Sequence, residues 1–188
     1  MTTIVLNGAS SSGKSSLAAE LQRRWSGALL VTGIDTFLAG FPGELFSGPG
    51  EDGRPGPTAE GFNVLPGEGP APSWVPLPGP AGLQLIRAAH RAWRAVGDSG
   101  QDQVVDHVLL DPASKKDARE VLSGPGYVWV GIRCDVDEVV RRETARGDRF
   151  PGASGTSALV HDGMSYDLEL DVTRTSPAEL AERLHAVF

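Results

Sequence analysis

Short apolar runs alternate with helical periods along most of the chain. Four runs are apolar at successive positions, which is typical of parallel strands buried on both faces. They are residues 4–6, 28–32, 104–110 and 127–132. A fifth segment differs, because Leu168, Leu170 and Val172 alternate with acidic residues and indicate an edge strand with one wet face. The pattern predicts five strands.

Apolar residues at helical spacing predict helices between these strands. After the first strand, Leu17, Leu21 and Trp25 share one helical face. Further helices are predicted at residues 83–96 and 114–122, and two more begin near the capping residues Asp135 and Ser176. Strands that alternate with helices predict an α/β fold of three layers, with a parallel five-stranded sheet and ligands at the carboxyl ends of its strands.

Residues 40–82 interrupt this pattern. Taken together, the glycines and prolines of the chain number 38, and 21 of them lie in this segment, which shows no helical or alternating period. A segment of this length is either an ordered insertion that faces the substrate or a partly mobile surface loop. The pattern leaves both interpretations open.

The composition bounds the class of protein. A chain of 188 residues with 40% apolar and 22% charged residues is typical of one globular domain, here residues 1–188, and not of a disordered chain. The net charge of −7 argues against nucleic acid as the main partner, because phosphate backbones require a basic surface.

The chain also lacks the signals of export and of membrane insertion. The short apolar run near the N-terminus has no basic segment before it, and no later run approaches the roughly 18 apolar residues of a membrane span. The single cysteine, Cys134, cannot close a disulfide within the chain, which favours a reducing compartment. We therefore expect a cytoplasmic protein with no membrane partner.

The strongest motif lies between the first strand and its helix. It matches G-x-x-x-x-G-K-[ST], a loop whose backbone N–H groups converge on phosphate oxygens. Lys14 adds a positive charge, and the hydroxyl of Ser15 can bind Mg²⁺. A serine-rich helix cap with a solvated lysine is the alternative, which the position at a strand-to-helix junction disfavours. The predicted nucleotide-binding residues are Gly8, Ala9, Ser10, Ser11, Ser12, Gly13, Lys14, Ser15 and Ser16.

Two aspartates follow predicted strands and are expected near this loop. Asp35 comes directly after the second strand, where it can accept a proton from an attacking hydroxyl or serve as a helix cap. Asp106 follows Val104 and Val105 in the third strand and is expected to hold Mg²⁺ together with Ser15, unless it is a solvent-facing aspartate. The neighbouring His107 either touches the acceptor or is hydrogen-bonded in place.

Basic residues beyond the fourth strand form a second candidate group. Arg142, Arg146 and Arg149 recur at spacings of four and three, so a continuous helix would project them from one side. Convergent guanidinium groups suit the charge of a moving phosphoryl group, although a solvated basic helix end has the same pattern. Lys115 and Lys116 are interpreted as surface charge.

Together these motifs resemble the chloramphenicol phosphotransferase family of P-loop kinases. The resemblance rests on residues 7–15, 33–35, 104–109, 129–134, 142–149 and 166–171. It implies a nucleotide-kinase-like fold and transfer of a phosphoryl group from a nucleoside triphosphate to an alcohol of a small antibiotic-like molecule. It also implies that Asp35 is the catalytic base, that Lys14 holds the phosphates, and that Arg142, Arg146 and Arg149 belong to a lid at about residues 142–160. Residues 40–82 and 150–159 depart from the family pattern, so the resemblance does not extend to chloramphenicol itself.

We therefore expect an O-phosphotransferase that uses Mg²⁺ with ATP or GTP, and Phe37, Phe41 and Trp74 are candidate walls of its acceptor site. Two alternatives remain. A kinase of a nucleoside, nucleotide or primary metabolite would need a basic clamp for an anionic acceptor, yet Arg54 is the only basic residue in 40–82. An NTP-dependent regulatory switch would bind nucleotide without acceptor chemistry. The sequence fixes neither the acceptor nor the oligomeric state.

Overall fold

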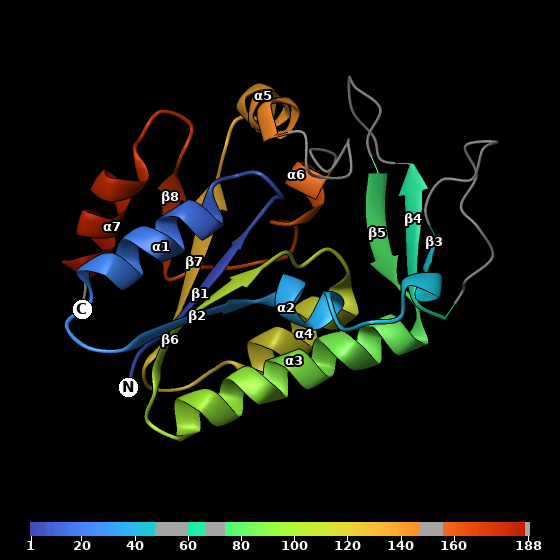
Figure 1. Ribbon diagram of the computed structural model, residues 1–188, viewed down its shortest axis with the longest axis horizontal. Coiled ribbons are helices and arrows are strands. Elements are labelled where there is room, and N and C mark those ends of the chain that lie inside the picture. Colours follow the sequence, from blue (N-terminus) through green and yellow to red (C-terminus); the bar gives the residue numbers. More distant parts are fainter. Residues whose placement is uncertain (48–59, 67–73, 147–155, 187–188) are drawn as a thin grey trace.

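A central sheet of five parallel strands organises the chain (Figure 1). The computed structural model describes residues 1–47, 60–66, 74–146 and 156–186. The sheet order is β2-β6-β1-β7-β8, so the prediction of a parallel five-stranded sheet with the last strand at its edge is confirmed. The strands are β1 (Thr3–Gly8), β2 (Leu29–Gly33), β6 (Asp102–His107), β7 (Tyr127–Arg133) and β8 (Leu168–Asp171).

Helices cover both faces of this sheet (Figure 1). On one face, α1 (Lys14–Arg24) and α7 (Pro177–His185) pack against an apolar core that includes Leu6 and Ile132. On the other face, α3 (Pro80–Asp98) and α4 (Pro112–Val121) enclose a second core around Trp93. The connections at the carboxyl ends of the strands carry α2 (Ile34–Leu38), α5 (Val136–Arg146) and α6 (Thr156–Leu159). No helix in the described ranges is long and apolar enough to cross a membrane.

The helix starts follow from capping chemistry. Ser176 and Glu179 form a capping box at α7, as the sequence predicts. The helix predicted from residue 114 begins earlier, because the Asp111 carboxylate accepts from the backbone N–H of Ser114 and proline stands in the first turn. Asp35 is not a helix cap, since the N-cap of α2 is Gly33 and Asp35 lies in the first turn.

A small sheet stands beside the N-terminal end of α3 (Figure 1). It consists of β3 (Phe46–Ser47), β4 (Phe62–Pro66) and β5 (Trp74–Pro78), and a short 3-10 helix, Gly43–Leu45, precedes it. Strand β4 pairs in parallel with β3 and antiparallel with β5. The sequence pattern does not predict these strands, because prolines at 76 and 78 lack the N–H that a strand donates. Residues 48–59 and 67–73 of the 40–82 segment lie outside the described residues.

Candidate active site

Left-handed backbone conformations shape the loop between β1 and α1. Ser11 and Gly13 adopt left-handed conformations, with φ of 59° and 102°, and α1 begins at the next residue, Lys14. Gly8 packs directly on β7, where an added Cβ would lie 2.8 Å from the main-chain oxygen of Ile132. The loop therefore turns tightly at the carboxyl edge of the sheet, with the first turn of α1 beneath it.

This loop suits an anionic ligand. Within the described part of the chain, the hydroxyls of Ser11 and Ser12 are buried and have no hydrogen-bond partner, and no side chain caps the N-terminus of α1. Buried donors of this kind are costly unless a ligand accepts from them. The N-terminal end of a helix adds a partial positive charge, so phosphate oxygens fit both features.

Lys14, Ser15 and Asp106 meet beside the loop, as the sequence predicts. The Lys14 ammonium donates to the main-chain oxygens of Gly8 and Ala9 at 2.8 and 2.7 Å. It also lies 3.6 Å from one carboxylate oxygen of Asp106, and the hydroxyl of Ser15 donates to the other at 2.7 Å. The three polar groups thus form one connected cluster at the end of β6.

The Ser15 and Asp106 pair fits a magnesium ion. No group of three or more His, Cys, Asp or Glu that could hold a metal occurs among the residues with described positions. Mg²⁺ differs from zinc in that it usually takes only one or two protein oxygens and completes its shell with water and substrate phosphate. A hydroxyl and a carboxylate next to a phosphate-binding loop match that requirement.

Asp35 lies close to this cluster because β2 runs beside β6. Gly33 pairs with Asp106 in the sheet, and an added Cβ at Gly33 would lie 2.7 Å from the main-chain oxygen of Asp106. The helix α2 that follows presents Asp35 to a cavity of ≈ 230 Å³, which we call the loop cavity. Residues of the loop, including Lys14 and Ser15, line its other side.

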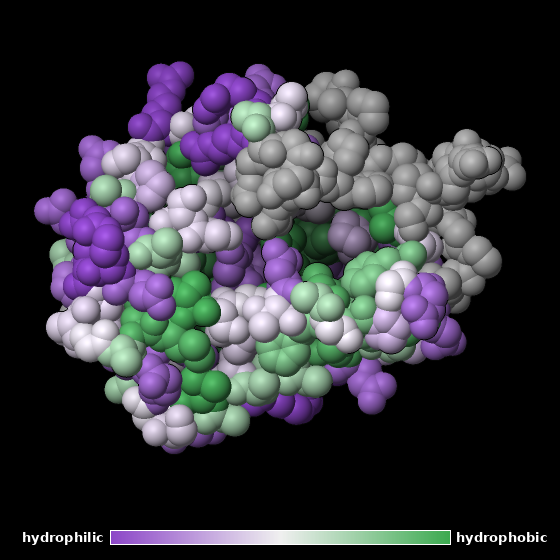
Figure 2. Space-filling view, in the orientation of Figure 1, coloured by the Kyte–Doolittle hydropathy of each residue, from purple (hydrophilic) through white to green (hydrophobic). Residues whose placement is uncertain are grey.

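A second cavity of ≈ 220 Å³, the apolar cavity, adjoins the loop cavity. Both are lined by Ser10, Ile34, Asp35 and Val108. Further walls of the apolar cavity come from the small sheet and from α3, and they include Phe46, Phe62 and Ile86. Figure 2 shows that this face of the molecule is hollowed near its centre, with hydrophobic residues visible inside the hollow.

The aromatic walls differ from those predicted. Phe46 and Phe62 stack with ring centroids 5.2 Å apart and line the apolar cavity. Phe41 packs edge-on against both rings, and Phe37 packs against Trp93, so neither predicted phenylalanine is a lining residue. The side chain of Trp74 lies outside the described residues. The pairing of β3 with β4 determines which aromatic rings face the cavity, and the sequence pattern does not predict this pairing.

Arg142 reaches the phosphate loop, but its guanidinium group is held by main-chain oxygens and by the carboxylate of Glu138. One terminal nitrogen donates to Ser12 at 2.9 Å and the other to Val172 at 2.8 Å. Its Nε donates to Glu138 at 2.7 Å, and the hydrogen bonds from Arg141 and Arg142 lower the pKa of Glu138 to about 2. Arg142 therefore connects the loop to the end of β8.

The described structure does not include the side chains of the other two predicted arginines. Arg146 is the last residue of α5, and its side chain lies outside the described residues. Arg149 also lies outside them. Their place in a lid stays a prediction.

Two further interpretations of single residues change. Both ring nitrogens of His107 are engaged inside the protein, one with His90 and one with the N–H of Val108, so His107 is hydrogen-bonded in place, and it also lines the apolar cavity. Lys115 is not surface charge, because it is buried and donates to the main-chain oxygens of Leu159 and Asp162, each at 2.7 Å. The contacts of His107 with His90 and of Lys115 with Leu159 and Asp162 have no signal in the sequence, since these partners are distant along the chain.

A third cavity of ≈ 440 Å³, the α5 cavity, opens on the other side of the loop. Ser11, Gly13 and Ser16 line it on the loop side, and Arg141 and Arg142 line it on the side of α5. The connection from β8 to α7 contributes Thr175 and Pro177. The phosphate loop thus separates two spaces, one toward Asp35 and one toward α5.

Sequence comparison identifies a family and relatives of this chain. The family model described as "Chloramphenicol phosphotransferase-like protein" matches residues 1–188. Two curated proteins named "Putative O-phosphotransferase", from two strains of Mycobacterium tuberculosis, are each 34% identical over 184 residues, which cover 97% of this chain and 80% of theirs.

Solved structures agree on the fold. A sugar kinase from Janibacter sp. HTCC2649 matches with a TM-score of 0.67 and 18% identity over 99% of this chain and 93% of its own. The Mycobacterium tuberculosis APS kinase CysC matches with a TM-score of 0.64 and 17% identity over 99% and 96%. At these identities the likeness concerns the fold alone, and the fold is that of P-loop kinases. The chain belongs to the chloramphenicol phosphotransferase-like family and is a phosphotransferase.

Proposed function

We propose that the protein is an O-phosphotransferase that moves the terminal phosphoryl group of ATP or GTP to a hydroxyl of a small, largely apolar, antibiotic-like molecule. The observation that carries this proposal is that Asp35 lines both the loop cavity and the apolar cavity. The first suits a triphosphate and the second suits the body of an acceptor. Asp35 therefore stands where the two reactants meet.

The donor is held by the loop. The N–H groups of the loop and Lys14 bind the β and γ phosphates, and Ser11 and Ser12 offer their buried hydroxyls. Ser15 and Asp106 would hold Mg²⁺, which when bound would supply positive charge next to the phosphate oxygens. The nucleoside extends into the α5 cavity, between Arg141 and Pro177. Residues 142–160, with Arg142, Arg146 and Arg149, act as the lid of a single kinase domain.

The transfer step needs one proton acceptor. Asp35 takes the proton of the acceptor hydroxyl as the hydroxyl oxygen bonds to the terminal phosphorus. The bond from that phosphorus to its bridging oxygen breaks, and the nucleoside diphosphate leaves. Little further covalent chemistry is required, so the main contribution of the site is to place the two reactants in line.

The chemistry of the apolar cavity selects among acceptors. Its described lining contains two carboxylates, Asp35 and Asp111, and no lysine or arginine. An acceptor with a phosphate or carboxylate group would be repelled there and would lack a cationic partner. Neutral or cationic molecules with an apolar body fit, which favours an antibiotic-like acceptor over a nucleotide or an anionic metabolite.

Acceptor-dependent release of ADP or GDP tests the proposal. A panel of hydroxylated natural products, nucleosides and common metabolites is incubated with the protein, Mg²⁺ and either nucleotide, and mass spectrometry identifies any product that has gained one phosphate. We expect the acceptor that is phosphorylated to be a neutral or cationic molecule with a largely apolar body. Transfer to anionic metabolites alone would support the alternative of a metabolic kinase, and nucleotide binding without any transfer would support a regulatory switch.

The role of Asp35 is tested with a matched pair of variants. We expect Asp35→Asn to lower kcat by about 100-fold or more, because the amide cannot accept the proton. Asp137→Asn removes an exposed carboxylate from the first turn of α5 and should leave kcat unchanged. Undiminished transfer by Asp35→Asn would remove Asp35 from the mechanism.

A further inference from the structure

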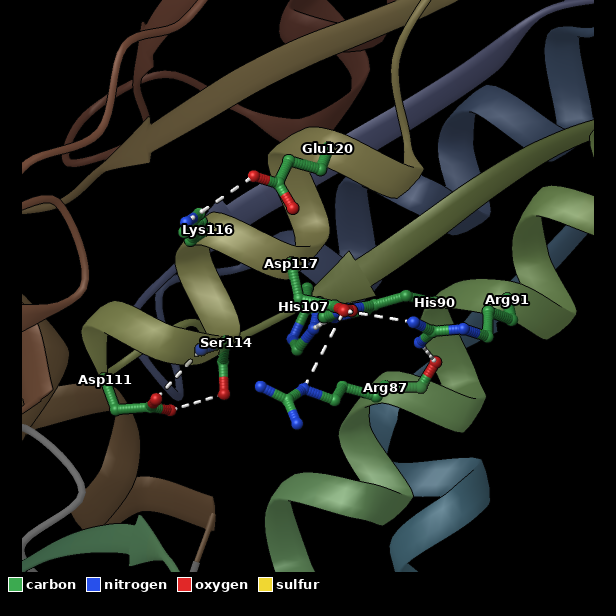
Figure 3. A network of polar contacts seen from close by, with 9 residues as sticks. All are labelled: Arg87, His90, Arg91, His107, Asp111, Ser114, Lys116, Asp117 and Glu120. Carbon is green, nitrogen blue, oxygen red and sulfur yellow. Dashed lines mark hydrogen bonds and ion pairs between the residues drawn. The ribbon is translucent and has the colours of Figure 1, made fainter.

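A chain of hydrogen-bonded side chains, two of them fully buried, runs from α4 to the end of β6 (Figure 3). His107, the last residue of β6, and His90, on α3, are 1% and 0% exposed. Their Nε2 atoms lie 2.8 Å apart, and Nδ1 of His90 lies 2.6 Å from a carboxylate oxygen of Asp117 on α4. The proposed transfer step uses none of these three side chains.

One backbone group fixes the direction of the protons in this chain. The N–H of Val108 donates to Nδ1 of His107 at 2.8 Å, so this nitrogen carries a lone pair. His107 therefore has its proton on Nε2 and donates it to Nε2 of His90. His90 in turn has its proton on Nδ1 and donates it to Asp117. Each ring has one tautomer that satisfies all of these contacts.

Two arginines hold the outer end of the chain. The second carboxylate oxygen of Asp117 lies 3.4 Å from Nη2 of Arg91 and 3.8 Å from Nε of Arg87. Arg91 also donates from Nη1 to the main-chain oxygen of Arg87 at 2.8 Å, which ties its guanidinium to α3. The carboxylate is thereby held as the terminal acceptor, between α3 and α4 (Figure 3).

The inner end of the chain lies at the candidate active site. Val108, which follows His107, lines both the loop cavity and the apolar cavity. Asp106, which precedes His107, contacts Ser15 and Lys14. The two histidines therefore anchor the short stretch of backbone that presents the proposed metal-binding carboxylate on one side and a cavity wall on the other.

We propose that His107, His90 and Asp117 are positioning residues that hold the end of β6 in the one place where Asp106 and Val108 serve phosphoryl transfer. This inference rests on the proposed function. His107 also lines the apolar cavity, but both of its ring nitrogens are engaged inside the protein, so the three side chains act on the site through the backbone they hold. A buried hydrogen-bond chain with a single allowed arrangement specifies one backbone position, which apolar packing alone defines less sharply.

NMR of the ligand-free protein tests the arrangement without any assay of activity. Long-range ¹H–¹⁵N correlations at about pH 7.5 distinguish protonated from unprotonated imidazole nitrogens. We expect His107 to carry its proton on Nε2 and His90 on Nδ1. Any other pair of tautomers, or exchange between tautomers, overturns the proposal even if the enzyme is active.

Kinetics of two variants at His90 test the consequence. His90→Leu removes both hydrogen bonds of the ring, whereas His90→Gln supplies one acceptor and one donor. We expect His90→Leu to lower kcat about 10-fold and to raise the Mg²⁺ concentration needed for half-maximal rate, with the acceptor KM changed far less. His90→Gln should recover most of kcat. The control is Lys116→Ala, next to Asp117 on α4, whose exposed side chain pairs only with Glu120, at 3.9 Å, among its described contacts.

The outcomes distinguish a failure of the positioning role from a failure of the proposed function. An unchanged kcat in His90→Leu, or a loss that His90→Gln does not recover, contradicts the positioning role. If His90→Leu does not fold, the variants Asp117→Ala and Asp117→Asn provide the same test. Asparagine keeps an oxygen that accepts from His90, so Asp117→Asn should retain the kcat that Asp117→Ala loses. If the wild-type protein transfers no phosphoryl group to any acceptor, the proposed function fails, and the NMR tautomers alone then decide the arrangement.

Discussion

His161 is a neutral hydrogen-bond acceptor at the end of a second polar chain. The side-chain amide of Asn7 donates to the hydroxyl of Tyr166 at 2.8 Å, so this hydroxyl gives its own proton to Nδ1 of His161, also at 2.8 Å. Burial lowers the pKa of His161 to about 4, from an ordinary value of 6.5. The folded protein therefore binds this proton more weakly than the unfolded chain does.

The pKa difference predicts how stability depends on pH. His161 contributes its full stabilisation above pH 6.5, and we expect that contribution to be lost as the pH falls from there through about 4. In His161→Gln the amide oxygen still accepts from Tyr166 but cannot titrate. The free energy of unfolding by urea should fall less for this variant than for the wild type over the same interval. Equal losses in both proteins would contradict the assignment.

At the scale of elements, α4 is connected to α6 through Lys115. The Lys115 ammonium donates to the main-chain oxygens of Leu159 and Asp162, each at 2.7 Å, and burial lowers its pKa. Leu159 is the last residue of α6, so Lys115 accounts for one of the carbonyls that a helix end leaves without an internal partner. Because α6 has only four residues, this contact from outside is important for its stability.

Adjacent lysines provide the test. Lys115→Ala should lower the free energy of unfolding by about 2 kcal/mol, because two main-chain oxygens lose the charged donor that the buried lysine supplies. Lys116→Ala should change it by less than about 0.5 kcal/mol, since that side chain is exposed. Urea unfolding of both variants measures the difference, and hydrogen exchange of residues 156–162 shows whether α6 loosens. Equal stability of the two variants would show that the buried contacts carry no net free energy.

Lys115 and Lys116 also show how far the structure could be predicted from the sequence. The strands, the phosphate loop and the meeting of Ser15 with Asp106 were predictable, because each depends on a local pattern or on the shared edge of parallel strands. The burial of Lys115 depends on carbonyls more than forty residues away, which no local pattern reports. The small sheet was missed for a different reason, since Pro76 and Pro78 argue against a strand.

At the scale of the whole molecule, the small sheet shares its core with the central sheet. Phe62 of β4 is 6% exposed and belongs to the same apolar cluster as Ile86 and Trp93 of α3. The main-chain oxygen of Gly61 also lies 2.6 Å from the position that a Cβ would take at Gly82, so β4 and α3 are in close contact at their ends. The apolar cavity is enclosed by elements of both sheets. Loss of this shared packing should therefore affect stability and acceptor binding together.

Variants of the two stacked phenylalanines, Phe46 and Phe62, distinguish the effect on stability from the effect on acceptor binding. Phe62→Ala should lower the free energy of unfolding by about 3 kcal/mol and raise the KM for the acceptor, because it removes both core packing and a cavity wall. Phe46→Ala should raise the KM similarly but cost less stability, since Phe46 is 37% exposed. If the two sheets form one cooperative unit, tryptophan fluorescence and circular dichroism will report a single urea transition in each variant. A separate early transition in Phe62→Ala would instead show that the small sheet folds independently, and acceptor binding would then depend on that local equilibrium.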